Sequence, residues 1–296
     1  MRPSVRACLA TVFVCAAWAS LASAAKPQRI VSLNLCTDQL LMLLVDRERI
    51  AAVSYLARRP ESSVLHAEAA KLPITYAQAE DVYVRRPDLV LAGTFTARAT
   101  VAMLKRLGIR VEEFKPAYSL ADIAMNLRRM GDLVGERSKA ETLITNFDAD
   151  LKKFEEGHPA QRPLAAFYYS NSYTSGGDTL AGEIATAAGL RNLGAELGLK
   201  QTMTLPLEVL VMSNPDLVIK GRTYDAPALA QEVFEHPALK FVQRQSDEAL
   251  VADKYTICGT PFTLHAVARL SEARKRLQSR TEGADDHGHR WADGTR

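Results

Sequence analysis

The sequence predicts an α/β protein in which two lobes, each built on a parallel sheet, are joined by one long helix. Three observations lead to this fold class. Short β-branched segments alternate with amphipathic helical segments in both halves, which is typical of parallel sheets with right-handed crossovers. One short motif occurs in each half of the chain. A long helical stretch, Ser119 to Glu156, separates the two halves.

The first residues have the features of a cleaved secretory signal. Arg2 and Arg6 precede an uncharged stretch from Ala7 to Leu21, and small residues typical of a cleavage site follow it. The apolar stretch is too short for a good membrane-spanning helix. We therefore expect residues 1–24 to be removed and the mature chain to be exported.

The composition excludes some partners and leaves one question open. The formal net charge of +3 falls to +1 when Arg2 and Arg6 are removed, so nothing favours binding to nucleic acid. We expect a monomer. Cys36 and Cys258 remain after processing, in a compartment that permits disulfides. The sequence leaves open whether they pair or stay as two thiols.

The first half alternates strands with helices. The first helix follows its strand directly and is predicted to be capped by Thr37. Pro87 ends a later helix, because the residue before proline is forced out of the helical region. The predicted strands are 29–34, 50–54, 88–93 and 109–114. The predicted helices begin near 37 and span 77–85 and 97–107, and 58–70 is a loop or an irregular helix.

The central helical stretch divides into two helices at Gly135. Ser119 and Asp122 predict a capping box for the first, which ends at Val134. Ser138 and Glu141 predict another for the second, from Lys139 to Glu156, which would be about 27 Å long. This second helix is the expected crossing between the lobes. The predicted division is 25–135 for the first lobe, 136–157 for the linking helix and 158–278 for the second lobe.

The second half repeats the alternation of strand and helix. A polar, glycine-bearing loop follows its first strand, and an irregular stretch separates the next two helices. The polar residues 279–296 are expected to be disordered. The predicted strands are 163–169, 216–220 and 249–252. The predicted helices are 179–188, 205–215, 228–234 and 261–277.

The repeated motif supports the two-lobe interpretation. Glu80 precedes the segment Pro-Asp-Leu-Val at 87–90, and Glu208 precedes the same segment at 215–218 with the same spacing. A junction of helix, proline and strand would produce part of this pattern in any α/β protein. Two copies in equivalent places of the two halves favour two related lobes.

The candidate binding residues lie in the loops that follow the predicted strands. Open α/β sheets bind ligands at the carboxyl ends of their strands, and in a two-lobe protein these loops would face each other across a cleft. Arg98, Arg222 and Lys254 could meet an anionic group. No cluster of His or Arg singles out one ligand. The candidates are Asn34, Cys36, Thr37, Tyr55, Phe95, Arg98, Tyr169, Tyr173, Arg222, Tyr224, Tyr255 and Cys258.

These residues carry a resemblance to a known family. The order and spacing of RIVSLN at 29–34, the two motif copies, GDLVGE at 131–136 and the turn 255–261 resemble periplasmic solute-binding proteins of ABC importers for ferric siderophores, haem and cobalamin. The resemblance covers residues 29–277. It implies two Rossmann-like lobes on one rigid helix, a metal chelate bound in a shallow cleft, and an inner-membrane ABC permease as partner. It also implies that Glu80 and Glu208 dock onto permease arginines, which bind carboxylates with two hydrogen bonds.

The two cysteines limit what the resemblance implies. Cys36 and Cys258 both fall in predicted cleft loops, where a disulfide would hold the lobes together and free thiols could touch the ligand or a soft metal.

A receptor for free zinc or manganese would need several His and carboxylate ligands, and the histidines here have no paired spacing. No catalytic motif supports a secreted enzyme. We expect a binding protein without a cofactor or a bound metal of its own.

Overall fold

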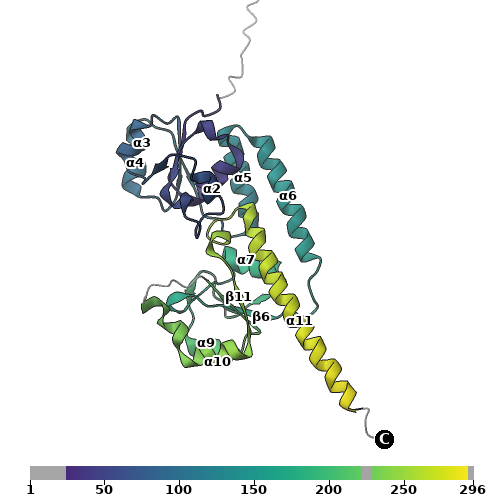
Figure 1. The fold of residues 1–296 in the computed structure, drawn as a ribbon. Helices are drawn as coiled ribbons and strands as arrows, with labels where there is room; N and C mark the ends of the chain where they lie inside the picture. The colour runs from purple at the N-terminus through teal and green to yellow at the C-terminus, as the bar shows by residue number, and fades with distance from the viewer. Residues whose placement is uncertain (1–24, 222–228, 293–296) are drawn as a thin grey trace, which may run out of the picture.

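The computed structural model describes residues 25–221 and 229–292, with side chains as far as Arg280. It has two parallel sheets, one in each half of the chain (Figure 1). This confirms the predicted fold class. The predicted signal, residues 1–24, lies outside the described residues.

The first sheet has five strands in the order β3-β2-β1-β4-β5, and every neighbouring pair is parallel. The strand β4 is buried along its whole length. The strands are β1 (Ile30–Ser32), β2 (Ile50–Ser54), β3 (Ile74–Thr75), β4 (Leu89–Gly93) and β5 (Val111–Phe114).

The second sheet has four strands in the order β11-β10-β6-β8, again all parallel. Its order matches that of β2, β1, β4 and β5 in the first sheet when β6 is set against β1 and β10 against β4. A short antiparallel pair, β7 with β9, lies beside it. The strands are β6 (Leu164–Phe167), β7 (Tyr173–Thr174), β8 (Arg191–Asn192), β9 (Met203–Thr204), β10 (Leu217–Lys220) and β11 (Asp247–Leu250).

Helices cover both sheets. In the first half they are α1 (Leu35–Leu44), α2 (His66–Ala69), α3 (Ala79–Val84), α4 (Arg98–Arg106) and α5 (Leu120–Val134), with 3₁₀ turns η1 (Arg47–Arg49) and η2 (Tyr55–Arg58). In the second they are α6 (Arg137–Glu155), α7 (Leu180–Ala187), α8 (Leu193–Glu196), α9 (Leu207–Ser213), α10 (Pro237–Gln245) and α11 (Leu264–Ala292). The 3₁₀ turns there are η3 (Ser170–Ser172), η4 (Leu229–Glu235), η5 (Asp253–Tyr255) and η6 (Pro261–Thr263).

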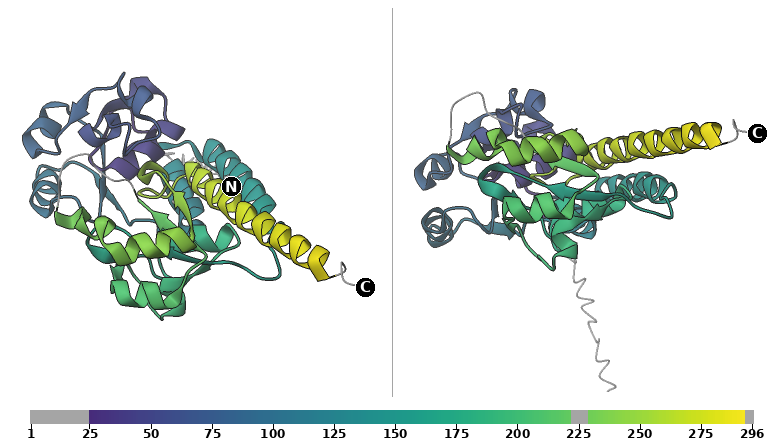
Figure 2. Two further views of the ribbon diagram at one scale, coloured as in Figure 1. Left: turned by 60° about the horizontal axis from the view of Figure 1, so that its bottom comes forward. Right: turned by 90° about the horizontal axis from the view of Figure 1, so that it is seen from below.

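The helices α6 and α11 run side by side along one side of the molecule, and α3 and α9 lie on the side away from them (Figures 1 and 2). The 19-residue helix α6 leads from the first half to the second. It packs on α5, where a Cβ added to Gly131 would lie 2.6 Å from Cβ of Ala140, so only glycine permits this approach. The core formed by these helices continues into both sheets.

One of the two predicted capping boxes is confirmed. Ser119 and Asp122 exchange backbone hydrogen bonds of 2.9 and 3.1 Å at the start of α5. The box predicted for α6 is wrong, because that helix begins at Arg137 and Glu141 instead accepts two bonds from Arg128 on α5, at 2.7 and 2.9 Å. A bidentate arginine attracts a carboxylate more strongly than one backbone N–H does.

The repeated motif has the same structural role in both halves. Asp88 accepts hydrogen bonds from the backbone N–H groups of Gln28 and Arg29, at 2.6 and 3.0 Å. Asp216 accepts one from Leu164 at 2.7 Å. Each aspartate therefore fastens the strand that begins its own half, β1 or β6, to the neighbouring strand.

Four further predictions need correction. Asn34, rather than Thr37, caps α1, because its extended backbone places its side chain 2.9 Å from the N–H of Cys36. The helix α10 was missed, and β11 begins two residues earlier than the predicted strand 249–252. Residues 279–292 continue α11, where we expected disorder, because extending a helix that has already formed costs little per residue.

Candidate functional site

A disulfide joins the segment that follows β1 in the first sheet to a segment that follows β11 in the second. Cys36 lies in the first turn of α1, directly after β1, and Cys258 follows β11 and η5. The two residues form a disulfide with their Cα atoms 5.1 Å apart. The disulfide therefore brings the start of α1 close to the loop that follows η5.

The residue after Cys258 lies next to the start of α5. A Cβ added to Gly259 would lie 2.3 Å from Cβ of Ala117, so the loop after Cys258 packs directly on the segment before α5. Glu183 on α7 also accepts a hydrogen bond of 3.1 Å from the backbone N–H of Leu120. A carboxylate at a helix N-terminus is favourable, so this bond helps to seat the second lobe on α5.

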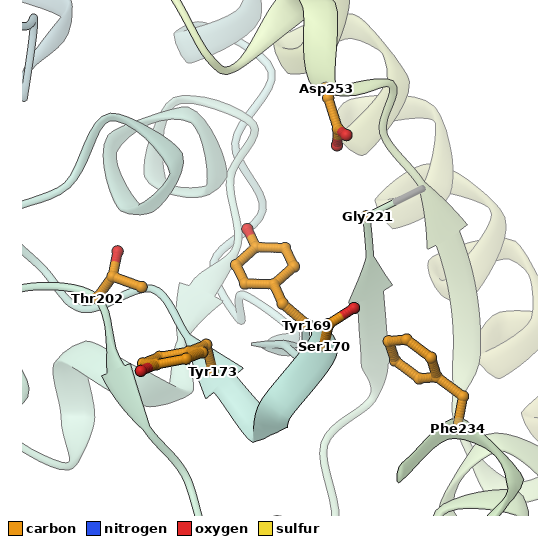
Figure 3. A pocket seen from close by; sticks show the side chains of 7 residues that line it. All are labelled: Tyr169, Ser170, Tyr173, Thr202, Gly221, Phe234 and Asp253. Carbon is orange, nitrogen blue, oxygen red and sulfur yellow. The ribbon is translucent and has the colours of Figure 1, made fainter. Parts of the chain in front are cut away.

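A hollow of about 320 Å³ lies at the carboxyl edge of the second sheet (Figure 3). Tyr169 points into it from the end of β6, and Asp253 faces it from the loop after β11. Aromatic rings and a few polar groups form its surface, as in most small-molecule sites. The residues that line it are Tyr169, Ser170, Tyr173, Thr202, Gly221, Phe234 and Asp253.

Tyr169 is held in place by its surroundings. Its ring lies 5.9 Å from that of Phe167, and the hydroxyl of Ser175 donates a 3.4 Å hydrogen bond to its hydroxyl. Burial raises the pKa of Tyr169 to about 12, and the negative charge of nearby Asp253 adds to this shift. The phenol therefore stays neutral near pH 7 and offers a flat face and a hydroxyl group to a ligand.

On the first lobe, two tyrosines follow adjacent strands. Tyr55 comes directly after β2 and Tyr76 directly after β3, and their rings stack with centroids 5.2 Å apart. The guanidinium carbon of Arg59 lies 5.5 Å from the centre of the Tyr55 ring. Phe95 follows β4 and is exposed.

Two residues predicted to bind a ligand use their side chains to stabilise the fold instead. The Asn34 amide caps α1 and also lies against Gly93, where an added Cβ would be 2.8 Å from its nitrogen. Thr37 is buried, with its hydroxyl 2.8 Å from that of Ser32. Their contacts position the start of α1, which carries Cys36.

A buried carboxyl group that the sequence did not reveal lies close by on α1. Asp38 accepts hydrogen bonds from the backbone N–H and the hydroxyl of Ser54, at 3.1 and 2.5 Å. Burial raises the pKa of Asp38 to about 7. These bonds fix the end of β2 immediately before Tyr55.

Two other residues predicted to bind a ligand, Arg98 and Tyr255, do not line the hollow. Arg98 begins α4 and is exposed, and Tyr255 packs against His265 with ring centroids 5.0 Å apart. Arg222 and Tyr224 lie outside the described residues. Sequence reasoning missed the lining residues Phe234 and Asp253, and also Tyr76, although a tyrosine at the end of a short strand was a signal for the last of these.

Among residues 25–221 and 229–280, no three His, Cys, Asp or Glu side chains come together in a group that could hold a metal ion. Within the described helices, none is long and apolar enough to cross a membrane.

Known proteins resemble the chain in sequence. A family model described as periplasmic binding protein matches residues 30–245. A cobalamin-binding protein of Halobacterium salinarum is 28% identical over 205 residues, which are 68% of this chain and 55% of the relative. An uncharacterized ABC transporter substrate-binding lipoprotein of Bacillus subtilis is 27% identical over 152 residues, 47% of each chain. The chain thus spans about half the length of these curated relatives.

Solved structures share the fold. A periplasmic heme-binding protein from Roseiflexus sp. RS-1 has a TM-score of 0.70 at 20% identity, and the match covers 84% of this chain and 98% of that one. The periplasmic vitamin B12 binding protein of Vibrio cholerae has a TM-score of 0.66 at 17% identity, covering 86% and 98%. At these identities the likeness concerns the fold.

Proposed function

The chain belongs to the periplasmic binding protein family, and from this premise we propose that it is the solute-binding component of an ABC importer. It captures an iron-siderophore, haem or cobalamin-type chelate between its lobes and delivers it to the membrane permease. The observation that carries this proposal is that aromatic rings follow strands of both sheets, in two halves that a disulfide ties together. Capture and release need no catalytic step.

The proposed setting is the periplasm, where the chain arrives after loss of residues 1–24 and acts as a monomer. We propose lobes at 25–135 and 158–278, with 136–157 linking them. The two sheets of equal strand order support this division. The disulfide between Cys36 and Cys258 fits an oxidising compartment.

Thermal-shift measurements test the ligand class. Cyanocobalamin, haemin and ferrioxamine B would each be added to the mature chain, with Zn²⁺ and Mn²⁺ as separate arms. A ligand present at about 100 times its Kd stabilises the folded state by about 2.7 kcal/mol, which is readily seen as a higher melting temperature. We expect at least one chelate to stabilise the protein. A shift with free Zn²⁺ or Mn²⁺ alone would replace this proposal with a metal-ion receptor.

Glu80 and Glu208 are the proposed docking groups for the permease. Both are exposed, and they occupy equivalent places on α3 and α9, at the same distance before the motif. Two carboxylates in equivalent positions suit a partner that presents one arginine to each lobe, because an arginine grips a carboxylate with two hydrogen bonds.

Charge reversal tests the docking proposal. In cells that lack their own copy of the receptor, Glu80→Lys with Glu208→Lys should abolish uptake of the chelate while the purified protein binds it unchanged. Glu68→Lys, an exposed glutamate on α2, is the matched control and should preserve uptake. Loss of ligand affinity in the double variant would refute the assignment.

A further inference from the structure

Exposed aromatic rings follow three strands of the first sheet. Tyr55, Tyr76 and Phe95 come after β2, β3 and β4 and are 38%, 64% and 81% exposed. Soluble proteins rarely leave large apolar side chains grouped on the surface unless a partner covers them. These rings lie at the carboxyl edge of the first sheet, the edge at which Cys36 is bonded to Cys258 of the second half, and we infer that the ligand of the proposed interlobe cleft covers them.

Two of the rings pack against each other. The rings of Tyr55 and Tyr76 are 5.2 Å apart and inclined by 27°, so they form a stack. Arg59 lies over the Tyr55 ring and pairs with Glu61 at 3.7 Å. A stack held in this way loses little side-chain freedom when a ligand binds. The more exposed Tyr76 provides its accessible face.

The opposite wall of the cleft has the same chemistry. Tyr169 and Tyr173 bring two phenol rings to the hollow, and Phe234 adds a third ring (Figure 3). A ligand between the lobes therefore meets aromatic rings on both sides. Aromatic faces pair best with other flat π-systems in offset-stacked or edge-to-face contact. Hydroxamate and carboxylate chelates of iron instead present flexible, polar surfaces that need hydrogen-bond partners.

We propose that the Tyr55–Tyr76 stack selects ligands with a flat conjugated face, namely tetrapyrrole-type macrocycles, over hydroxamate and carboxylate chelates of iron. This inference rests on the proposed function and narrows its ligand class. Arg59 is a positioning residue that holds the stack. Porphyrins present this face openly and corrins present a more puckered one, so haemin and cyanocobalamin are separate probes.

Isothermal titration of the mature chain tests the selection. The probes are haemin, cyanocobalamin, ferrioxamine B and ferric citrate. One macrocycle should bind at least about 10-fold more tightly than either siderophore-type chelate, the scale of one or two stacking contacts. Tighter binding of ferrioxamine B or ferric citrate would overturn the inference and leave the receptor function standing. Failure of all four probes to bind would overturn both.

Matched variants show whether the ring faces are responsible. Tyr76→Leu, which keeps an apolar side chain but loses the flat face, should weaken macrocycle binding about 3- to 10-fold, and Tyr76→Phe should leave it within about 2-fold. Tyr83→Leu is the control, since Tyr83 is an exposed tyrosine on α3, shortly before β4 begins. Equal affinities of the leucine and phenylalanine variants of Tyr76, at unchanged thermal stability, would refute a role for the stack.

Discussion

The disulfide between Cys36 and Cys258 should contribute strongly to stability. The two cysteines are 222 residues apart in sequence, so the bond closes almost the whole mature chain into one loop. The chain-entropy model gives about 5 kcal/mol for a loop of this length. The stabilisation is smaller if the unfolded chain keeps structure. Removing a native disulfide typically lowers the free energy of unfolding by about 2–5 kcal/mol.

The experiment replaces both cysteines by alanine. Alanine suits this site because Cys258 is only 1% exposed, and serine would bury a hydroxyl group. Urea unfolding followed by circular dichroism would compare the oxidised native chain, the reduced native chain and the double variant. We expect the last two to unfold at similar, clearly lower urea concentrations. Equal midpoints for the oxidised and reduced native chain would refute the reasoning.

Three other predictions concern single residues. Asp38 has a pKa of about 7 when folded against 3.8 ordinarily, so the folded state holds a proton that the unfolded state releases between these values. The stabilisation by this proton is fully present below about pH 4 and is lost as the pH rises through 7. The free energy of unfolding therefore falls by up to about 1.4 kcal/mol per pH unit in this range. Asp38→Asn should remove this pH dependence from the free energies of unfolding measured at pH 4 to 8. Asp88→Ala should lower the free energy of unfolding more than Asp216→Ala, because Asp88 accepts two backbone bonds and Asp216 accepts one, each worth about 1.5–3 kcal/mol; the reverse order would contradict the assigned role. Ser119→Ala should cost about 1 kcal/mol by removing the cap of α5, as measured by urea unfolding.

The features that could be predicted from the sequence are those with a local physical signal. The buried strand β4 is continuously apolar, and Ser119 with Asp122 forms a local capping pattern, so both were found. The two copies of Pro-Asp-Leu-Val indicated related halves, and the equal strand order of the two sheets agrees with this.

The missed features depend on contacts between distant residues. Glu141 leaves the predicted capping box because Arg128, on another helix, binds it. The strands β8 and β9 are each two residues long, too short to show the alternation of polar and apolar residues that marks a strand. They form because they pair with β6 and β7. Tyr76 joins the candidate site only because its strand pairs with β2, which brings its ring onto Tyr55.

Hydrogen–deuterium exchange with and without ligand tests the central claim, capture between the two lobes, most directly. The probe is whichever of haemin, cyanocobalamin and ferrioxamine B raises the melting temperature most. Slower exchange is expected both in the first lobe, around residues 55–58 and 74–76, and in the second lobe, around residues 169–174. Slower exchange in one lobe alone would contradict binding in the interlobe cleft.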